Sequence, residues 1–515
     1  MTAPTPLGAI AGFLPPLPPE LAALPVSGIA LDSRRVRPGF LFAALPPAAR
    51  PGAAVAAALD DRGRAHIADA VRRGAGAVLA PPDTAWPEGV ARVPLIEVAR
   101  PRAVLARLAA AHAGPQPPTI AAVTGTNGKT STVEFLRQLW DGTGVPAASL
   151  GTLGLRAAIT LPEAPPALTT PDSVSLAAVL AGLAAGGIGA VALEASSHGL
   201  DQFRLDGVRI TAAGFSNLSQ DHLDYHGTLA AYRDAKLRLF EELLPATGIA
   251  AANADMDRET LARLRGLCLG RGIALRTAGE NGRTLQLLRA TPLPHGQVLE
   301  LSVLGRSPVA VETTLPGRYQ ADNVMLATLL AAPAEEDLAV LLPRLGSLSG
   351  VRGRMELAAR LPNGACSFVD YAHTPDAIER LLASLRPHVA PGGRLLAVIG
   401  AGGDRDRTKR APMGAAAARG AELCFVTDDN PRTENPALIR ADVMAGCPGG
   451  IEVPDRRRAI ADALAALRPG DVLVVAGKGH EQGQIVGDTV LPFDDAAVIR
   501  ELAGTLPPAT ADAPA

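Results

Sequence analysis

The chain has 515 residues, too many for a single hydrophobic core, and this length predicts two to four domains. A formal net charge of −2 and a pI near 6.5 argue against a nucleic-acid-binding surface or a basic membrane-binding face. The four cysteines show no C-x-x-C spacing and predict buried thiols in a reducing compartment. We expect a cytoplasmic protein with no nucleic-acid or membrane partner, and separately we expect a monomer.

The N-terminal region mixes short apolar runs with Pro and Gly turns. The segment up to Pro25 has no basic stretch and is broken by prolines, so we expect no signal peptide. Farther along we predict a helix over Ile67–Gly76 and a strand over Ala77–Ala80. A proline-rich linker at 113–118 marks a domain boundary.

The most informative segment is 119–131, TIAAVTGTNGKTS, an apolar run that ends in a glycine turn. Thr119–Thr124 is typical of a buried parallel strand, and Ser131–Trp140 is typical of the helix that follows. The glycines let backbone N–H groups approach an anion, Lys129 supplies charge for the β/γ-phosphates, and the Thr130 hydroxyl can ligate Mg²⁺. A glycine turn that binds nothing is the alternative, which the strand and the helix disfavour. The pattern predicts ATP binding by Gly125, Thr126, Asn127, Gly128, Lys129, Thr130 and Ser131.

Strand-like runs alternate with helical segments over 116–346, the pattern of a parallel sheet with helices on both faces. Ser173–Leu193 carries no charged residue and is long enough to span a membrane. Its Ala and Gly content instead predicts a helix to Ala185, a glycine turn and a strand from Ala190. The predicted strands are Ile120–Val123, Val191–Glu194, Ala212–Asn217 and Ile249–Asn253.

A second α/β series occupies 347–515, with helices such as Thr374–Leu385 between its strands. The tail Thr505–Ala515 is rich in Pro and Ala, and we expect it to be frayed. The fold class is therefore α/β in three domains: a small α/β domain over 1–115, a mostly parallel P-loop-type sheet over 116–346, and a Rossmann-like domain over 347–515. Strands of the last domain are predicted at Ala365–Asp370, Leu395–Gly400, Leu423–Thr427 and Val472–Ala476.

Polar clusters follow six of these strands, at the sheet edge where open parallel sheets bind ligands. A single residue there is more often a cap or a turn residue, but six clusters together predict an active site with ATP between domains. Thr130 and Glu194 offer the oxygen ligands that Mg²⁺ prefers, and His222 is a less usual ligand type. The clusters are Glu194–His198, Asn217–Gly227, Asp370–His373, Gly402–Arg407, Asp428–Arg432 and Gly477–Glu481.

Eight motifs recur in chain order: GTNGKTS (125–131), LEASSHGL (193–200), NLSQDHLDYHG (217–227), GRME (353–356), VDYAHTPD (369–376), GGDRDRTKR (402–410), TDDNPRTENP (427–436) and AGKGHE (476–481). They strongly resemble the Mur ligases, the ATP-dependent amide-bond-forming enzymes of peptidoglycan precursor synthesis. The resemblance implies an N-terminal domain for a UDP moiety, a central ATPase domain and a C-terminal domain that receives an amino acid. The loop at 45–63 departs from the family because it is longer and lacks a histidine.

The resemblance also implies roles for particular residues. Leu31 and Ser33 would contact the uridine nucleotide, and Asn323 and Arg354 would hold ATP. Lys236 occupies the place of a carbamylated lysine that ligates a second Mg²⁺ with His222, although the residues alone favour a solvated helix lysine. The implied muramoyl-peptide contacts are Thr169, Thr170, Ser196, Gln202 and Arg204, the catalytic set is Lys129, Glu194, His222 and Lys236, and the metal set is Thr130, Glu194, His222 and carbamylated Lys236.

The reaction implied by the resemblance joins an amino acid to UDP-N-acetylmuramoyl-L-alanyl-D-glutamate through an acyl phosphate. We expect the amino acid to be meso-diaminopimelate, because the planar fork of Arg432 suits a second carboxylate. The alternative for Arg432 is a cap on the Asn-Pro turn or a pair with Glu434. The remaining expected contacts are Arg405, Asp429, Asn430, Pro431, Gly477 and Glu481.

Three other functions stay open. An L-lysine-adding or other Mur ligase and a folylpolyglutamate-type ligase would run similar chemistry on other substrates. A nucleotide switch without catalysis would need only one metal site, and the density of acidic and histidine residues near the loop argues against it.

Overall fold

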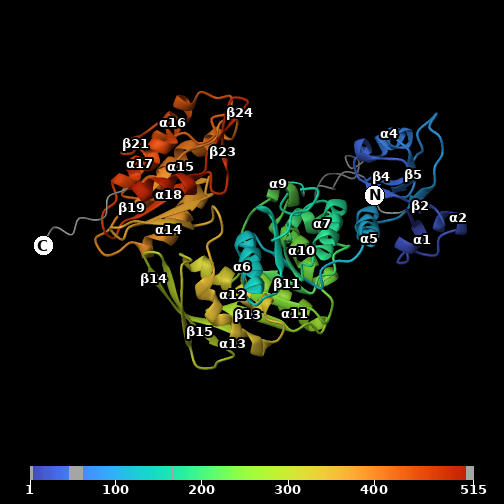
Figure 1. The fold of residues 1–515 in the computed structure, drawn as a ribbon, viewed down its shortest axis with the longest axis horizontal. Coiled ribbons are helices and arrows are strands. Elements are labelled where there is room, and N and C mark those ends of the chain that lie inside the picture. The colour runs from blue at the N-terminus through green and yellow to red at the C-terminus, as the bar shows by residue number, and fades with distance from the viewer. Residues whose placement is uncertain (1–3, 46–61, 165, 167, 506–515) are drawn as a thin grey trace. The chain divides into compact units, whose positions relative to one another are not determined.

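The structure is a computed structural model, which describes residues 4–45, 62–164, 166 and 168–505 (Figure 1). By compactness the chain divides into a first unit, 1–278 with 326–335, and a second unit, 279–325 with 336–515. The division into three domains stays a prediction. Most of the histidine-free 45–63 loop and the tail after residue 505 lie outside the described residues.

The N-terminal part of the first unit is a 4-stranded parallel sheet in the order β3-β4-β5-β6. The predicted helix over Ile67–Gly76 is too long, because Gly74 adopts φ 95° and turns the chain into a strand at Ala75. The elements of this N-terminal part are β1 Thr5–Pro6, α1 Leu7–Ile10, α2 Pro19–Ala22, β2 Pro25–Val26, β3 Gly28–Ala30, β4 Phe40–Ala43, α3 Arg62–Ala65, α4 Ile67–Arg72, β5 Ala75–Ala80, β6 Leu95–Glu97 and α5 Pro101–Ala113.

The central sheet of the first unit has the order β13-β12-β11-β7-β10-β8-β9. All neighbours whose register is given are parallel except β8 and β9. Predicted strands match within about two residues, and the runs over 147–151 and 275–279 are strands that the sequence analysis missed. The strands are β7 Thr119–Thr124, β8 Ala147–Gly151, β9 Gly154–Arg156, β10 Ala190–Glu194, β11 Ala212–Phe215, β12 Ile249–Asn253 and β13 Leu275–Gly279.

Helices cover both faces of this sheet. α6 packs on β7, β8 and β10, while α7, α10 and α11 bury apolar side chains against the alternate strand residues. The uncharged run 173–193 is therefore the helix α7 followed by β10, and among the described residues no helix is long and apolar enough to cross a membrane. The helices are α6 Lys129–Gly142, α7 Ser173–Ala185, α8 Ser197–Asp201, α9 Leu223–His226, α10 Leu229–Arg238, the π-helical turn Leu239–Leu243 and α11 Arg258–Gly270.

The second unit begins with an antiparallel meander of β14, β15 and β16, strands that the sequence analysis did not predict within the mostly parallel sheet expected over 116–346. Only two residues separate β14 from β15, and such a short connection requires an antiparallel pair. The elements are β14 Leu285–Leu293, β15 Gly296–Val303, β16 Val309–Thr313, the first part of α12 Arg318–Ala331, whose residues from 326 on belong to the first unit, and α13 Leu338–Leu341.

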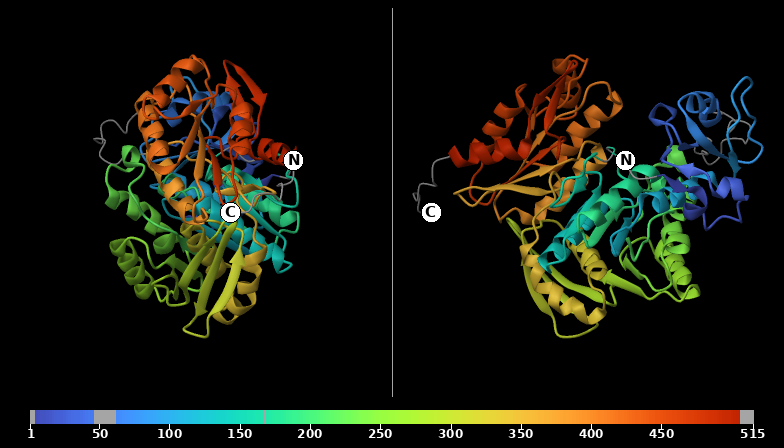
Figure 2. Two further views of the ribbon diagram at one scale, coloured as in Figure 1. Left: turned by 90° about the vertical axis from the view of Figure 1, so that its left-hand side faces the viewer. Right: turned by 45° about the vertical axis from the view of Figure 1, so that its right-hand side comes forward.

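A 6-stranded sheet with the order β17-β18-β22-β19-β20-β21 forms the rest of this unit, and only its edge strand β17 is antiparallel. α14, α15 and α16 bury one face, and α17 and α18 bury the other (Figure 2). The elements are β17 Glu356–Arg360, β18 Cys366–Asp370, α14 Pro375–Leu385, β19 Leu395–Ile399, α15 Arg410–Gly420, β20 Leu423–Val426, α16 Pro436–Met444, β21 Ile451–Glu452, α17 Arg456–Ala465, β22 Val472–Ala476, β23 Gly483–Val486, β24 Thr489–Pro492 and α18 Asp495–Thr505.

His388, just after α14, ties the meander to the 6-stranded part of the unit. Its Nδ1 lies 2.7 Å from the Leu293 carbonyl oxygen, and its Nε2 accepts a 2.8 Å hydrogen bond from the Gly317 N–H. An imidazole that accepts at Nε2 and donates at Nδ1 is neutral. The ring is buried, and burial lowers the pKa of His388, which favours the same neutral form.

Candidate active site

The glycine loop after β7 has a left-handed backbone, which favours glycine, at two positions. Gly125 adopts φ 140° and Gly128 adopts φ 84°. A Cβ added to Gly125 would lie 2.0 Å from the Ser216 hydroxyl, so the loop and the end of β11 approach too closely for any side chain there. The helix α6 starts at Lys129 and directs its N-terminal N–H groups toward this loop.

Residues after β11 brace the loop in this shape. The Asn217 side chain accepts from the Asn127 N–H at 2.9 Å and donates to the Asn127 carbonyl at 3.1 Å. The Ser216 hydroxyl donates to the same carbonyl at 2.6 Å. The sequence placed Asn217 in a polar cluster but did not single out Ser216, because a bracing contact across about 90 positions leaves no local pattern.

Two lysines converge on the loop. Lys129 Nζ donates to the carbonyls of Gly125 at 2.9 Å and Thr126 at 2.8 Å. Lys236, from α10, donates to the Gly125 carbonyl at 2.7 Å and lies 4.3 Å from the centre of the Tyr232 ring. Burial, and secondarily the charge of Lys129, lowers the pKa of Lys236 well below its usual value. Lys236 is thus a buried side chain and not the solvated lysine that its residue type alone favours.

Glu194, the last residue of β10, is 2% exposed. Its carboxylate accepts from the Thr152 N–H at 2.8 Å and from the Thr152 hydroxyl at 3.2 Å. A Cβ added to Gly151 would lie 2.1 Å from the carboxylate, so β8 must carry glycine where it passes Glu194. Thr152 is a partner that the sequence analysis missed.

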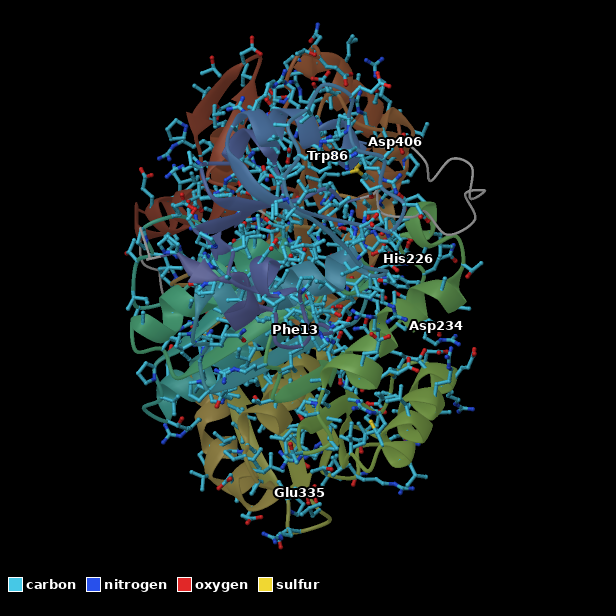
Figure 3. The ribbon with its side chains drawn as sticks, turned by 90° about the vertical axis from the view of Figure 1, so that its right-hand side faces the viewer. Phe13, Trp86, His226, Asp234, Glu335 and Asp406 are labelled. Atoms are coloured by element: carbon cyan, nitrogen blue, oxygen red, sulfur yellow. The ribbon has the colours of Figure 1, made fainter. Side chains whose placement is uncertain are left out.

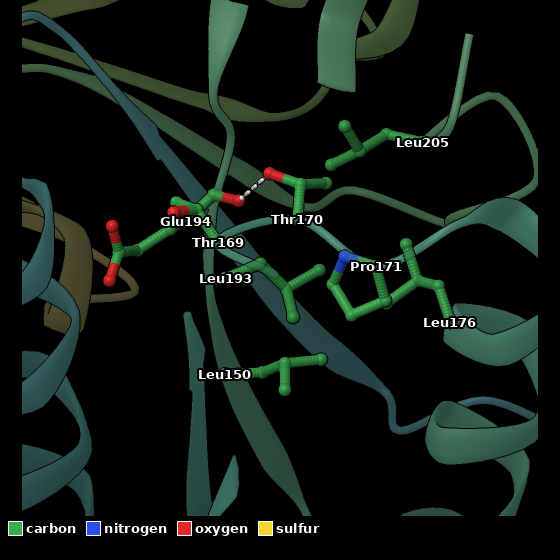
Figure 4. Close-up of a pocket in the computed structure, with 8 residues that line it drawn as sticks. All are labelled: Leu150, Thr169, Thr170, Pro171, Leu176, Leu193, Glu194 and Leu205. Carbon is green, nitrogen blue, oxygen red and sulfur yellow. Dashed lines mark hydrogen bonds between the residues drawn. The ribbon is translucent and has the colours of Figure 1, made fainter. Parts of the chain in front are cut away.

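The predicted muramoyl-peptide contacts lie beside Glu194, and Figure 4 shows two of them, Thr169 and Thr170. The Thr170 hydroxyl donates to the Glu194 carbonyl at 2.7 Å. The Ser196 hydroxyl lies 3.0 Å from the Thr170 hydroxyl. Arg204 donates to the Thr170 carbonyl at 2.6 Å and to Gln202 Oε1 at 2.7 Å. Thr169, whose hydroxyl lies 3.1 Å from that of Thr152, lines a small pocket with Glu194 and several leucines.

His222 lies in a cluster of aromatic rings on α8, α9 and α10. Its ring is 5.0 Å from that of His198, and its backbone is left-handed with φ 51°. His226, labelled in Figure 3, lies 5.6 Å from His198. The Tyr225 hydroxyl donates to Asp201 at 2.7 Å, and burial is the main cause that raises the pKa of Tyr225 to about 12. His222 itself is about half exposed, so its imidazole is accessible to a ligand.

Among the described residues, no three His, Cys, Asp or Glu side chains gather closely enough to hold a metal ion. The predicted metal set contains two residues of these types, Glu194 and His222. Its other members are Thr130 and a modified Lys236. The donor chemistry nevertheless fits Mg²⁺, since Glu194 is a buried carboxylate with lone pairs beyond its two accepted hydrogen bonds. Which of these residues ligate a metal stays a prediction.

The other predicted nucleotide contacts lie in different parts of the chain. Asn323 donates to Gln320 Oε1 at 3.1 Å, and Gln320 donates to the Arg354 carbonyl at 3.3 Å, so the two predicted ATP contacts of the second unit share a partner. The Arg354 guanidinium lies 5.0 Å from the centre of the Tyr371 ring. In the first unit Ser33 is buried in a short helical turn that follows Leu31. Asp32 caps this turn, and its side chain accepts from the Arg34 N–H at 2.9 Å.

Predicted amino-acid contacts meet at the carboxyl ends of β20 and β22. Asn430, which is 3% exposed, donates to Glu481 Oε2 at 2.8 Å. Asp429 is 8% exposed, and its Oδ2 has no hydrogen-bond partner among the described residues. A Cβ added to Gly477 would lie 2.7 Å from that oxygen. Lys478, which donates to Asn430 Oδ1 at 2.8 Å, is a member of this cluster that the sequence analysis missed, although its AGKGHE motif was noted.

Arg432 has a left-handed backbone with φ 51°, held by β23: its N–H donates to the Ile485 carbonyl at 3.0 Å. Its guanidinium donates to the Gly403 carbonyl at 2.8 Å. Glu434, the alternative partner, instead forms ion pairs with Arg407 and Arg410, each at 2.8 Å. Pro431 is buried beside Arg432, while Arg405 is exposed.

Comparison with known proteins identifies the family. The model of the Mur ligase middle domain matches residues 123–331, and that of the Mur ligase glutamate ligase domain matches residues 353–479. A Caulobacter vibrioides protein named UDP-N-acetylmuramoyl-L-alanyl-D-glutamate--2,6-diaminopimelate ligase is 48% identical over 92% of this chain and 94% of its own. A Brucella melitensis protein of the same name is 44% identical over 96% and 97%.

Solved structures agree with this assignment. A UDP-N-acetylmuramoyl-L-alanyl-D-glutamate--2,6-diaminopimelate ligase matches with a TM-score of 0.72 at 33% identity, over 97% of this chain and 99% of that one. Folylpolyglutamate synthase from Mycobacterium tuberculosis, complexed with ADP, matches with a TM-score of 0.56 at 18% identity over 79% and 94%, which shows a shared fold alone. The chain belongs to the Mur ligase family.

Proposed function

We propose that this protein is the ATP-dependent ligase that adds meso-2,6-diaminopimelate to UDP-N-acetylmuramoyl-L-alanyl-D-glutamate during peptidoglycan synthesis. The relatives with this printed name support the reaction. The observation that carries the choice of amino acid is the cluster at the ends of β20 and β22, where a guanidinium fork and two carboxylates lie on neighbouring loops. Diaminopimelate carries one carboxylate and one ammonium group at each end, which match these charges.

In the first half-reaction the D-glutamyl carboxylate attacks the γ-phosphorus of ATP, and ADP leaves. Two anions that repel each other must be held in line, so the protein contributes position and positive charge. The loop around Gly125 and Gly128 supplies backbone N–H groups, and Lys129 supplies a cation beside it. Thr170, Ser196, Gln202 and Arg204 are proposed to position the muramoyl peptide.

We place Mg²⁺ with Thr130, Glu194 and His222, and with Lys236 as a carbamate. When bound, the ion would neutralise phosphate charge and polarise phosphoryl oxygens. The environment of Lys236 supports the carbamate, because its lowered pKa favours the neutral amine that attacks CO₂. The new N–C bond would form as the amine loses a proton, which converts the side chain into an anion next to Lys129.

In the second half-reaction the amine of diaminopimelate attacks the acyl-phosphate carbonyl, and phosphate leaves from the tetrahedral intermediate. Arg432 and Arg405 are proposed to bind substrate carboxylates, and Asp429 and Glu481 to bind an ammonium group. Asn430, Pro431 and Gly477 shape the site around them. Water must be excluded, since it would hydrolyse the acyl phosphate.

Mass spectrometry of the products tests the proposal. The parent protein would be incubated with ATP, UDP-N-acetylmuramoyl-L-alanyl-D-glutamate and one amino acid at a time. We expect a tripeptide product with meso-diaminopimelate, and ADP and phosphate in equal amounts. A product only with L-lysine would assign the protein to a lysine-adding ligase, and phosphate release only with a folate and glutamate would assign it to the folylpolyglutamate-type alternative. ATP hydrolysis that no amino acid stimulates would overturn both ligase assignments.

The place of action and the assembly state are also proposals. The chain carries residues for all three predicted substrates, so we propose that a monomer is active. Its substrates are soluble nucleotide and amino-acid compounds, so we propose that it works in the cytoplasm. Sedimentation of the active protein would test the first point, and cell fractionation would test the second.

A further inference from the structure

Lys478 is a fully buried lysine two residues after the end of β22, with 0% of its surface exposed. Its Nζ donates to Asn430 Oδ1 at 2.8 Å and lies 3.4 Å from Glu481 Oε2. Burial is the main cause that lowers the pKa of Lys478, and the nearby carboxylates of Asp429 and Glu481 oppose that shift. A buried cation costs stability unless its partners are well placed, so its position calls for a role.

The neighbours of Asn430 fix which way its side-chain amide points. Oδ1 accepts from Lys478 Nζ and, at 2.9 Å, from the Ile485 N–H. Rotating the amide by half a turn would set its NH₂ group against two donors, which is unfavourable. Nδ2 is therefore left to donate to Glu481 Oε2 at 2.8 Å.

This orientation determines what the site offers a substrate. Asn430 holds one oxygen of Glu481, so the carboxylate of Glu481 has a fixed position. Asp429 Oδ2 is buried without a hydrogen-bond partner among the described residues, and Gly477 lies so close to it that a Cβ there would be 2.7 Å away. The fixed carboxylate of Glu481 and the unsatisfied carboxylate oxygen of Asp429 suit a substrate that brings its own ammonium group.

We infer that Lys478 is a positioning residue for amino-acid selection: it orients the Asn430 amide, which holds Glu481 for the ammonium group of the substrate. Lys478 acts through Asn430, and through its own 3.4 Å contact with Glu481, and does not touch the substrate. This inference rests on the proposed function. A purely structural lysine would instead affect stability and all substrates alike.

A double-mutant cycle tests the inference in the full-length protein. The variants are Lys478→Met, Asn430→Ala and the pair together, with apparent KM for diaminopimelate, ATP and the UDP-precursor, kcat and Tm measured for each. We expect Lys478→Met to raise the KM for diaminopimelate by at least about tenfold, with the other KM values within about twofold of the parent. The effect of the double variant on this KM is expected to be smaller than the product of the two single effects, because both residues act on the position of Glu481.

Arg394→Met is the matched control. Arg394 forms a 2.6 Å ion pair with the buried Asp471 at the amino ends of β19 and β22, the opposite end of the sheet from Asn430. Its loss is expected to lower Tm without changing the KM for diaminopimelate. If Lys478→Met behaves like Arg394→Met, or if the effects of Lys478→Met and Asn430→Ala simply multiply, the inference is wrong.

Asn430→Asp provides a test that keeps Lys478 in place, should Lys478→Met fail to fold. A carboxylate still accepts from Lys478 and Ile485 but repels Glu481, so the KM for diaminopimelate is expected to rise as in Asn430→Ala. A parental KM would refute the relay through Asn430. If the parent does not use diaminopimelate, the proposed function fails, while the Tm values of the cycle still test the coupling of Lys478 to Asn430: additive Tm losses would refute it.

Discussion

Lys129 and Lys236 both donate a hydrogen bond to the carbonyl oxygen of Gly125, at 2.9 Å and 2.7 Å. The same oxygen thus accepts hydrogen bonds from two amines, which are carried by helices that begin about 100 positions apart in the chain. The proximity disfavours two positive charges, and the charge of Lys129 helps to lower the pKa of Lys236. Carbamylation of Lys236 would replace this repulsion with an attractive pair.

Lys129→Ala is expected to lower the ligation rate by on the order of 10²-fold or more, because it removes a cation that the loop places beside the transferred phosphoryl group. Circular dichroism and Tm should show an intact fold. Arg137→Ala is the control, since it removes a cation from the same helix that forms ion pairs with Glu134 and Asp141. Ligation by Lys129→Ala within a few-fold of the parent would contradict the assignment of the loop.

Lys236 is expected to carry a carbamate under CO₂, detectable as a ¹³C signal after labelling with bicarbonate. Lys236→Ala should lose activity, and added short carboxylates should restore part of it by supplying the missing anion. Full activity in CO₂-depleted buffer, with an unmodified Lys236 in a crystal structure, would rule the carbamate out.

Arg432→Ala is expected to raise the apparent KM for diaminopimelate by tens of fold, since losing a charge-paired contact costs roughly 2–5 kcal/mol. The preference over L-lysine should shrink, because only diaminopimelate has the second carboxylate. Arg419→Ala removes an exposed arginine from α15, a helix that packs on the same sheet. This control should leave the KM for diaminopimelate and the preference over L-lysine unchanged. An unchanged preference in Arg432→Ala would show that another residue is the selector.

Acidic pH is expected to weaken the hydrogen bonds by which His388 links the meander to the 6-stranded part of the second unit. The pKa of its imidazole is lower in the folded protein than the usual 6.5, so the unfolded chain binds a proton first as the pH falls. The contribution of His388 to stability is therefore complete above pH 6.5 and is lost as the pH falls below it. The Tm of the parent should drop more steeply than that of His388→Gln between about pH 6.5 and 5, as measured by calorimetry. Parallel curves would show that His388 does not contribute.

Runs of β-branched and small apolar residues predicted the central strands well: Ile249–Asn253 and Val472–Ala476 match the observed strands at both ends. The meander β14–β16 was missed, since its residues lack the long apolar runs that mark buried parallel strands. The motifs supplied most of the residues of the candidate site, whose roles stay predictions. They could not reveal Lys478 as a partner of Asn430, because a hydrogen bond across 48 positions depends on how two strand ends meet.

The left-handed backbone of Arg432 makes this position unusual for mutagenesis. Most side chains are strained at φ 51°, whereas glycine adopts it without a penalty and asparagine adopts it readily. A saturation library at this position should therefore rank thermal stability and diaminopimelate use in different orders. Glycine should rank high in thermal stability and low in diaminopimelate use. The requirement for backbone conformation and the requirement for substrate binding at residue 432 can thus be separated.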